Sequence, residues 1–172
     1  MSRELRPDPV EFERFCDRAL PDVYGYLYAR CRDRVLAEDL TSETFMSAVS
    51  AFQRATVEDW TVGWLIVVAR RRLVDHWRRQ AREDRLARSL EPDDLGGAAD
   101  EWEATLDVER ALAALDRLPP HHRVVLVLRY LDGLPVAEVA CEVGRGFHAT
   151  EALLQRARRA LRRAYEEEQA HA

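Results

Sequence analysis

The chain has 172 residues, with 26 basic residues that are all arginine, 31 acidic residues and a net charge of −5. It contains no run of about twenty apolar residues, which excludes membrane insertion through a spanning helix, and its first residues lack the apolar core of a signal peptide. We therefore expect a cytoplasmic protein. Cys16, Cys31 and Cys141 form no CxxC pair, so the sequence predicts buried thiols and neither disulfides nor a zinc site.

Charge is segregated along the sequence. Residues 61–90 hold 8 arginines against 3 acids and residues 145–163 hold 6 against 1, whereas residues 91–109 hold 8 acids and no basic residue. Because salt screens charges beyond about 8–10 Å, each basic segment can attract a polyanion although the whole chain is acidic. The pattern favours nucleic acid as a partner.

Turn-forming residues divide the chain into helices, and no segment shows the alternation of a strand. We expect an all-α fold of two small helical domains, over 1–90 and 105–172, the second a helix-turn-helix domain. Between them, residues 91–104 combine Pro, Gly and carboxylates, which predicts a flexible acidic linker. The periodicity predicts helices over 9–18, 21–32, 35–53, 63–88, 105–117, 120–130, 135–143 and 147–166.

The helix expected over 35–53 is amphipathic. Its apolar arc comprises Leu40, Phe45, Ala48, Val49, Ala51 and Phe52. Its outer face carries Asp39, Ser42, Glu43, Met46, Ser47 and Ser50. An outward methionine among acidic residues is more typical of a protein-binding surface than of one that faces only water.

The helix expected over 63–88 changes character along its length. Residues 64–69 are apolar on all sides, which predicts that its first turns are enclosed. Farther on, one face turns Leu73, Val74 and Trp77 toward the core, and another presents Arg71, Arg72, Asp75, Arg78 and Arg79. Trp60 precedes this helix, and an aromatic ring beside a basic face suits single-stranded DNA. A core position explains Trp60 equally well, and a basic face alone is usually a solvated surface.

The C-terminal domain has the spacing of a helix-turn-helix motif. Pro119-Pro120 starts a helix, Asp132-Gly133-Leu134-Pro135 turns the chain, and Gly144 allows a second tight turn after a short helix. The final helix places Leu153, Leu154, Ala157, Ala160, Leu161 and Ala164 on one side. Its other side carries His148, Glu151, Ala152, Gln155, Arg156, Arg159, Arg162 and Arg163, a polar head for base edges followed by arginines for phosphates. A helical hairpin with a solvated charged face is the plainer alternative.

No catalytic constellation is visible in the sequence. It has no HExxH motif, no glycine-rich phosphate loop and no supported pair of acids, and we expect no cofactor. Adjacent His121 and His122 would point about 100° apart on a helix, which argues against a shared metal and predicts capping or surface positions. An enzyme or a pure interaction protein is therefore less well supported than a DNA-binding protein.

Taken together, these segments resemble the extracytoplasmic-function (ECF) group of bacterial sigma factors, in the sigma-70 superfamily. Ala37-Glu38-Asp39-Leu40-Thr41-Ser42-Glu43-Thr44-Phe45, with Trp64-Leu65 and Leu73-Val74-Asp75-His76, resembles sigma region 2. Leu118-Pro119, Asp132-Gly133-Leu134-Pro135-Val136-Ala137-Glu138-Val139-Ala140 and Arg156-Ala157-Arg158 resemble region 4. Region 4 alone is similar to many response-regulator domains, but both regions in this order over residues 10–165 are specific.

The resemblance implies a sigma factor that confers promoter recognition and transcription initiation on core RNA polymerase, without catalysis of its own. Asp39, Ser42, Glu43 and Met46 would bind the clamp helices of the largest polymerase subunit, and the C-terminal domain would bind the flap of the second-largest. Trp60 and the basic face over 71–79 would contact the minus-ten element of promoter DNA. The helix from Phe147 would enter the major groove at the minus-thirty-five element. Family members are often restrained by an anti-sigma factor.

A free-standing helix-turn-helix transcriptional regulator is the alternative, but it leaves the helix over 63–88 without a role.

Two positions depart from the family pattern. Arg71 stands where Asn is common, so the minus-ten preference does not carry over from relatives. Gly146 stands where a capping Ser is frequent, at a cost of only a few tenths of a kcal/mol.

Overall fold

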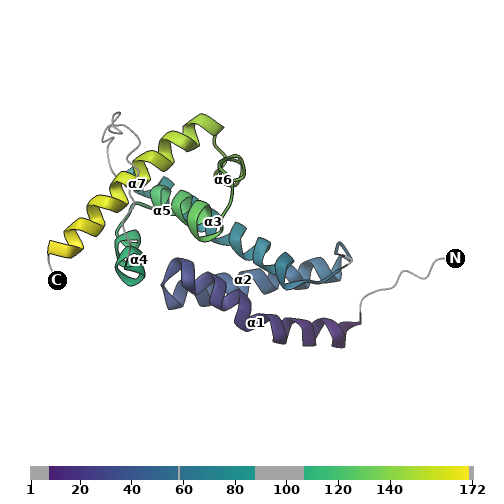
Figure 1. Cartoon of the computed structure of the whole chain (residues 1–172). Helices are drawn as coiled ribbons and strands as arrows, with labels where there is room; N and C mark the ends of the chain where they lie inside the picture. The colour runs from purple at the N-terminus through teal and green to yellow at the C-terminus, as the bar shows by residue number, and fades with distance from the viewer. Residues whose placement is uncertain (1–7, 58, 88–106, 171–172) are drawn as a thin grey trace. The chain divides into compact units, whose positions relative to one another are not determined.

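The computed structural model describes residues 8–57, 59–87 and 107–170, and in these ranges every regular element is a helix (Figure 1). The expected all-α fold is confirmed for this part of the chain. Two compact units are present, Met1–Leu73 and Val74–Ala172. The acidic linker expected over 91–104 lies outside the described residues. None of the helices described is both long and apolar enough to cross a bilayer.

The first unit is built on an antiparallel pair of helices, α1 (Pro9–Cys31) and α2 (Arg34–Gln53), which pack side by side (Figure 1). Each begins at an aspartate: Asp8 accepts from the backbone N–H of Val10 at 3.0 Å, and Asp33 from that of Leu36 at 3.1 Å. Side-chain caps of this kind satisfy backbone donors that the first turn leaves unpaired. The turn between the helices places Arg32 in the left-handed region, at φ 52°. The caps and this turn give a two-residue connection.

One continuous helix replaces the two that we expected over 9–18 and 21–32. Pro21 lies inside α1 and faces solvent. A proline removes one backbone hydrogen bond, which costs most where the freed carbonyl is buried. Here Ala19, Val23 and Leu27 are fully buried on one side of α1, so packing on both sides of Pro21 holds the helix together.

The buried face of α2 also differs from the expected arc. Val49 is 42% exposed, whereas Thr41 and Thr44 are buried beside Leu40 and Ala48. Both threonine hydroxyls donate to the carbonyl four residues earlier, at 2.7 Å. Because these bonds satisfy the hydroxyls within the helix, threonine fits a buried helix face that an apolar residue would otherwise fill.

Helix α3 (Val62–Ala87) begins at Thr61, whose Oγ1 accepts from the N–H of Trp64 at 3.1 Å. The expected core positions Leu73, Val74 and Trp77 are confirmed, each 1–2% exposed. The expectation that residues 64–69 are enclosed on all sides is wrong. Only Leu65 and Ala69 are buried, and the other four are half-buried, because the helix turns one side of its apolar start toward solvent.

The second unit gathers its helices around α7 (Phe147–Ala170), which packs against three others (Figure 1). These are α4 (Val108–Asp116), α5 (Pro120–Leu126) and α6 (Val136–Val143). A π-helical turn, η1 (Val127–Leu131), ends the α5 segment, where we expected an uninterrupted α-helix. Arg123 donates to the carbonyls of Leu115, Asp116 and Leu118 and so closes the end of α4.

Two smaller expectations fail in the structure. The ring centroids of His121 and His122 lie 4.3 Å apart, so the two side chains converge instead of pointing apart, and both are half-buried rather than exposed. Cys141 is exposed, although Cys31 is buried and Cys16 half-buried as thiols. Burial raises the pKa of the Cys16 thiol, with the nearby Asp17 carboxylate adding to the effect. Cys141 is exposed because α6 presents it on the side away from the buried Val139 and Ala140.

Candidate nucleic-acid interface

Helices α6 and α7 form a helix-turn-helix whose turn is fixed by a glycine. Gly144 ends α6 in the left-handed conformation, at φ 66°. Its N–H donates to the carbonyl of Cys141, and the N–H of Arg145 donates to that of Ala140 at 3.0 Å. This Schellman-type ending satisfies the last carbonyls of α6. It lets α7 begin three residues after Gly144, so the predicted short turn is confirmed.

The polar side of α7 matches the residues expected to face DNA. His148, Ala152, Gln155 and Arg163 are exposed, while Glu151, Arg156, Arg159 and Arg162 are half-buried. On the opposite side, Thr150, Leu153, Leu154, Ala157 and Ala164 are buried, which anchors the helix in its unit. The exposed residues follow a spacing of three and four, so the structure gathers them on one helical face.

Two ion pairs modify that face. His148 Nδ1 lies 3.2 Å from Glu151 Oε2, and Arg162 Nε lies 2.9 Å from Glu166 Oε1. Pairs of this kind on exposed helices are weak, so both groups can exchange partners at little cost. Gln155 lies near the middle of the face and is exposed, whereas Arg156 is half-buried beside it.

The basic face of α3 is longer than the sequence interpretation placed it. Arg71, Asp75 and Arg79 are exposed, and Arg78 is half-buried with its Nη1 3.8 Å from Asp75 Oδ1. Arg72 Nη2 donates to Ser47 Oγ at 2.7 Å, so this arginine also ties α3 to α2. Arg82 and Arg85 continue the same face and are exposed. Arg82 follows Asp75, and Arg85 follows Arg78, by two helical turns, so the helical period of the sequence predicts both residues on this face.

Trp60 lies in an aromatic cluster. Its ring centroid is 4.8 Å from that of Phe12, 5.2 Å from Trp64, 6.2 Å from Phe52 and 6.4 Å from Phe15. The ring is half-buried, and its indole N–H is buried without a hydrogen-bond partner among the described residues. Of the two roles that the sequence left open for Trp60, this packing favours the core role.

An exposed stripe runs along α2 on the side away from its buried threonines. Asp39 and Ser42 are exposed, Glu43 is half-buried, and Met46 is 70% exposed. Val35, at 67% exposure, and Val49 belong to the same stripe at helical spacing. The sequence interpretation missed Val35 and assigned Val49 to the core. The stripe is therefore more apolar than expected, as protein-binding surfaces commonly are at their centre.

The order of the two basic helices along the chain matches a known family. Residues 15–83 match the family model described as Sigma-70 region 2, and residues 109–161 match that of Sigma-70, region 4. The ECF RNA polymerase sigma factor SigF of Caulobacter vibrioides is 33% identical over 127 residues, which cover 72% of this chain and 68% of SigF. The chain belongs to the ECF group of sigma factors, in the sigma-70 family.

Other relatives agree with this assignment, which confirms the resemblance. The ECF sigma factor BldN of Streptomyces coelicolor is 34% identical over 156 residues, which cover 88% of this chain. The chain spans only 59% of the length of BldN. Among solved structures, the sigma factor RpoE of Bartonella quintana, in complex with the anti-sigma factor NepR, has a TM-score of 0.53 at 21% identity. The match covers 91% of this chain and 97% of RpoE, and it supports the fold.

Proposed function

We propose that this ECF sigma factor confers promoter recognition on core RNA polymerase and initiates transcription in the cytoplasm, without covalent chemistry of its own. The observation that carries the proposal is the exposed polar side of α7 behind a tight helix-turn-helix turn, in the same chain as a second basic helix. Two weak DNA modules that are held on one polymerase gain affinity through effective concentration. A sigma factor of this kind therefore needs the enzyme to bind its promoter well.

We propose that the two regions have different functions. Residues 1–90 act as the region 2-like domain, which binds polymerase and the minus-ten element, and residues 105–172 act as the region 4-like domain. Residues 91–104 connect them. The basic face of α3 holds the minus-ten DNA, with Arg71 in a position that sets a preference particular to this chain. Trp60 supports this surface by fixing the segment before α3.

The polymerase contact that we propose is the stripe on α2. Its exposed apolar residues, Met46, Val35 and Val49, are flanked by the acidic side chains of Asp39 and Glu43. Such a surface combines an apolar centre with charges that orient the partner. We assign it to the clamp helices of the largest subunit, and the region 4-like domain to the flap of the second-largest. We further propose a restraining anti-sigma partner, since RpoE was solved with one.

The minus-thirty-five contact is tested by two substitutions on α7 with different expected effects. Gln155→Ala removes a group that can bond a base edge, so polymerase holoenzyme should lose about 1 to 3 kcal/mol at one or two base pairs and little at others. Arg163→Ala removes a phosphate contact, so affinity should fall for all sequences and the salt dependence should flatten by about one unit. Affinities over a set of single-base promoter variants and several salt concentrations measure both effects.

If Gln155→Ala and Arg163→Ala lowered affinity in the same uniform way, α7 would not read bases. If neither changed promoter selectivity, the assignment of this helix to the major groove would be wrong.

A further inference from the structure

The first turn of α7 presents an exposed phenylalanine next to the polar side that we assign to DNA. Phe147 is the first residue of α7 and is 46% exposed. No other large apolar side chain described on α7 is exposed, because Leu153, Leu154 and Tyr165 are buried and Leu161 is half-buried. A single exposed apolar residue is common on protein surfaces. Phe147, however, lies at the end of the helix that contacts base edges in helix-turn-helix proteins.

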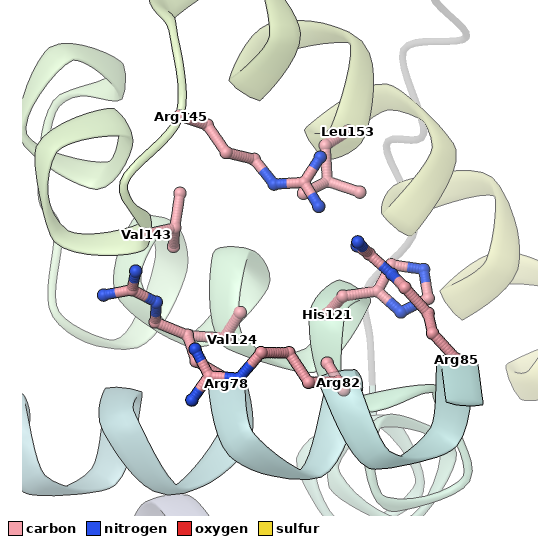
Figure 2. Close-up of a pocket in the computed structure, with 9 residues that line it drawn as sticks. Arg78, Arg82, Arg85, His121, Val124, Val143, Arg145 and Leu153 are labelled. Carbon is pink, nitrogen blue, oxygen red and sulfur yellow. The ribbon is translucent and has the colours of Figure 1, made fainter. Parts of the chain in front are cut away.

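The turn before α7 makes Phe147 the first exposed side chain after Gly144. Arg145 is half-buried, and Figure 2 shows its side chain extending into a cavity of about 170 Å³ that Val143 and Leu153 also line. Gly146 has no side chain. Because Cα–Cβ bonds in an α-helix tilt toward its N-terminus, a side chain in the first turn leans past the start of the helix. Phe147 is therefore placed at the tip of α7.

The ring of Phe147 contacts a residue of the polar side. Its centroid lies 5.6 Å from that of the His148 ring, at an interplanar angle of 83°, which is an edge-to-face contact. His148 Nδ1 in turn lies 3.2 Å from Glu151 Oε2. Phe147 also precedes Glu151 by one helical turn, so both residues belong to the same side of α7. The three side chains form one group at the start of the polar side, and Phe147 is its apolar member.

The residue types at the start of α7 favour thymine over guanine as the base that this group contacts. The first two turns carry no arginine, and the first arginine of α7 is Arg156. Arginine bound to guanine is the commonest specific contact in the major groove, so these turns lack the side chain best suited to guanine. An apolar ring has one apolar counterpart on the base edges, the 5-methyl group of thymine, which the other three bases lack.

We propose that Phe147 is a specificity-determining residue that packs against the 5-methyl group of a thymine in the minus-thirty-five element. This inference rests on the proposed function, in which α7 enters the major groove. Thymine and uracil differ only in that methyl group, so promoter affinity should depend on the methyl itself and not only on the base pair. Removing one methyl group from water corresponds to about fourfold in affinity.

The experiment uses polymerase holoenzyme and a promoter duplex that the wild-type holoenzyme selects from a random library. Each thymine of the upstream element is replaced in turn by deoxyuridine, which keeps the hydrogen-bonding groups of the base pair and removes the methyl group. Affinities are measured for the wild type, Phe147→Ala and Phe147→Leu. The matched control is Tyr28→Ala, which removes an aromatic ring of the same 46% exposure from α1. Melting curves confirm that each variant is folded.

We expect the wild type and Tyr28→Ala to lose about fourfold in affinity when uracil replaces one particular thymine. Phe147→Ala should bind the thymine and uracil duplexes equally at that position, because it has no ring to cover the methyl group. Phe147→Leu should keep part of the difference. The comparison isolates the contact, since an effect of Phe147→Ala on folding or on polymerase binding would lower both affinities by the same factor.

The same uracil profile for the wild type and Phe147→Ala would overturn the inference, even if the variant bound the promoter more weakly overall. An upstream element without any A·T pair would overturn it as well. In either case Gln155→Ala tests the proposed function separately: if this variant lost its preference at one or two base pairs of the upstream element, α7 would remain in the major groove and Phe147 would be a structural residue. If the holoenzyme selected no promoter at all, the proposed function and this inference would both fail.

Discussion

Replacing Trp60 with alanine should destabilise the first unit by about 3 to 4 kcal/mol. A fully buried tryptophan removes 150–250 Å² from water, so half-burial removes about 100 Å², which contributes about 2.5 kcal/mol at 25 cal/mol per Å². The edge contacts of Trp60 with Phe12 at 4.8 Å and with Trp64 at 5.2 Å add about 0.5 to 1.5 kcal/mol. The melting temperature of this unit should fall by about 12 to 32 °C, at about 4–8 °C per kcal/mol for a unit of this size.

Trp60→Phe is the matched control, because phenylalanine keeps an aromatic ring in the cluster. It forfeits no hydrogen bond, since the indole N–H has no partner among the described residues. We expect it to cost less than about 1.5 kcal/mol. Urea unfolding followed by circular dichroism gives both free energies, and binding to single-stranded promoter DNA is measured at a temperature where each variant is folded.

The contrary result would identify Trp60 as a base-stacking residue. In that case Trp60→Ala would unfold at the wild-type urea midpoint and would still lose affinity for single-stranded promoter DNA. The aromatic cluster would then be incidental to stability, and the core role favoured here would be wrong.

The remaining predictions concern the helix-turn-helix turn and the polymerase surface. Gly146→Ser should raise the free energy of unfolding by a few tenths of a kcal/mol, because a serine can cap α7 and no neighbouring atom lies within 4 Å of the new Cβ. Gly144→Ser should lower the free energy of unfolding by more than about 1 kcal/mol, because position 144 has a φ of 66° and an added Cβ would contact Arg78. A higher melting temperature for Gly144→Ser than for Gly146→Ser would contradict this account of the turn. Val49→Asp should weaken core polymerase binding by about tenfold or more, whereas Val10→Asp, at a valine of 50% exposure on α1, should not. Equal affinities of these two variants in a fluorescence binding assay would remove α2 from the interface.

The sequence predicted best the elements that begin or end at a capping or turn-forming residue. The α6–α7 turn follows from Gly144, which alone tolerates its backbone conformation without strain, and α2 begins where Asp33 can cap it. The polar side of α7 followed from periodicity, because the apolar residues opposite it leave a single way to pack the helix.

The errors arose where packing overrides a local preference. Pro21 is a helix breaker by propensity, but buried residues on either side keep α1 whole. Thr41 and Thr44 are polar residues, but their hydroxyls donate to carbonyls of the same helix, so both side chains can be buried in the core.

Run-off transcription with purified core RNA polymerase and a promoter library tests the central claim most directly. If the chain is the promoter-recognising subunit, adding it to core enzyme should produce transcripts from a subset of promoters that share two sequence elements at a constant spacing. The Gln155→Ala variant should shift the preference at the upstream element only. No promoter-dependent transcript, together with no association between the chain and core polymerase, would contradict the account.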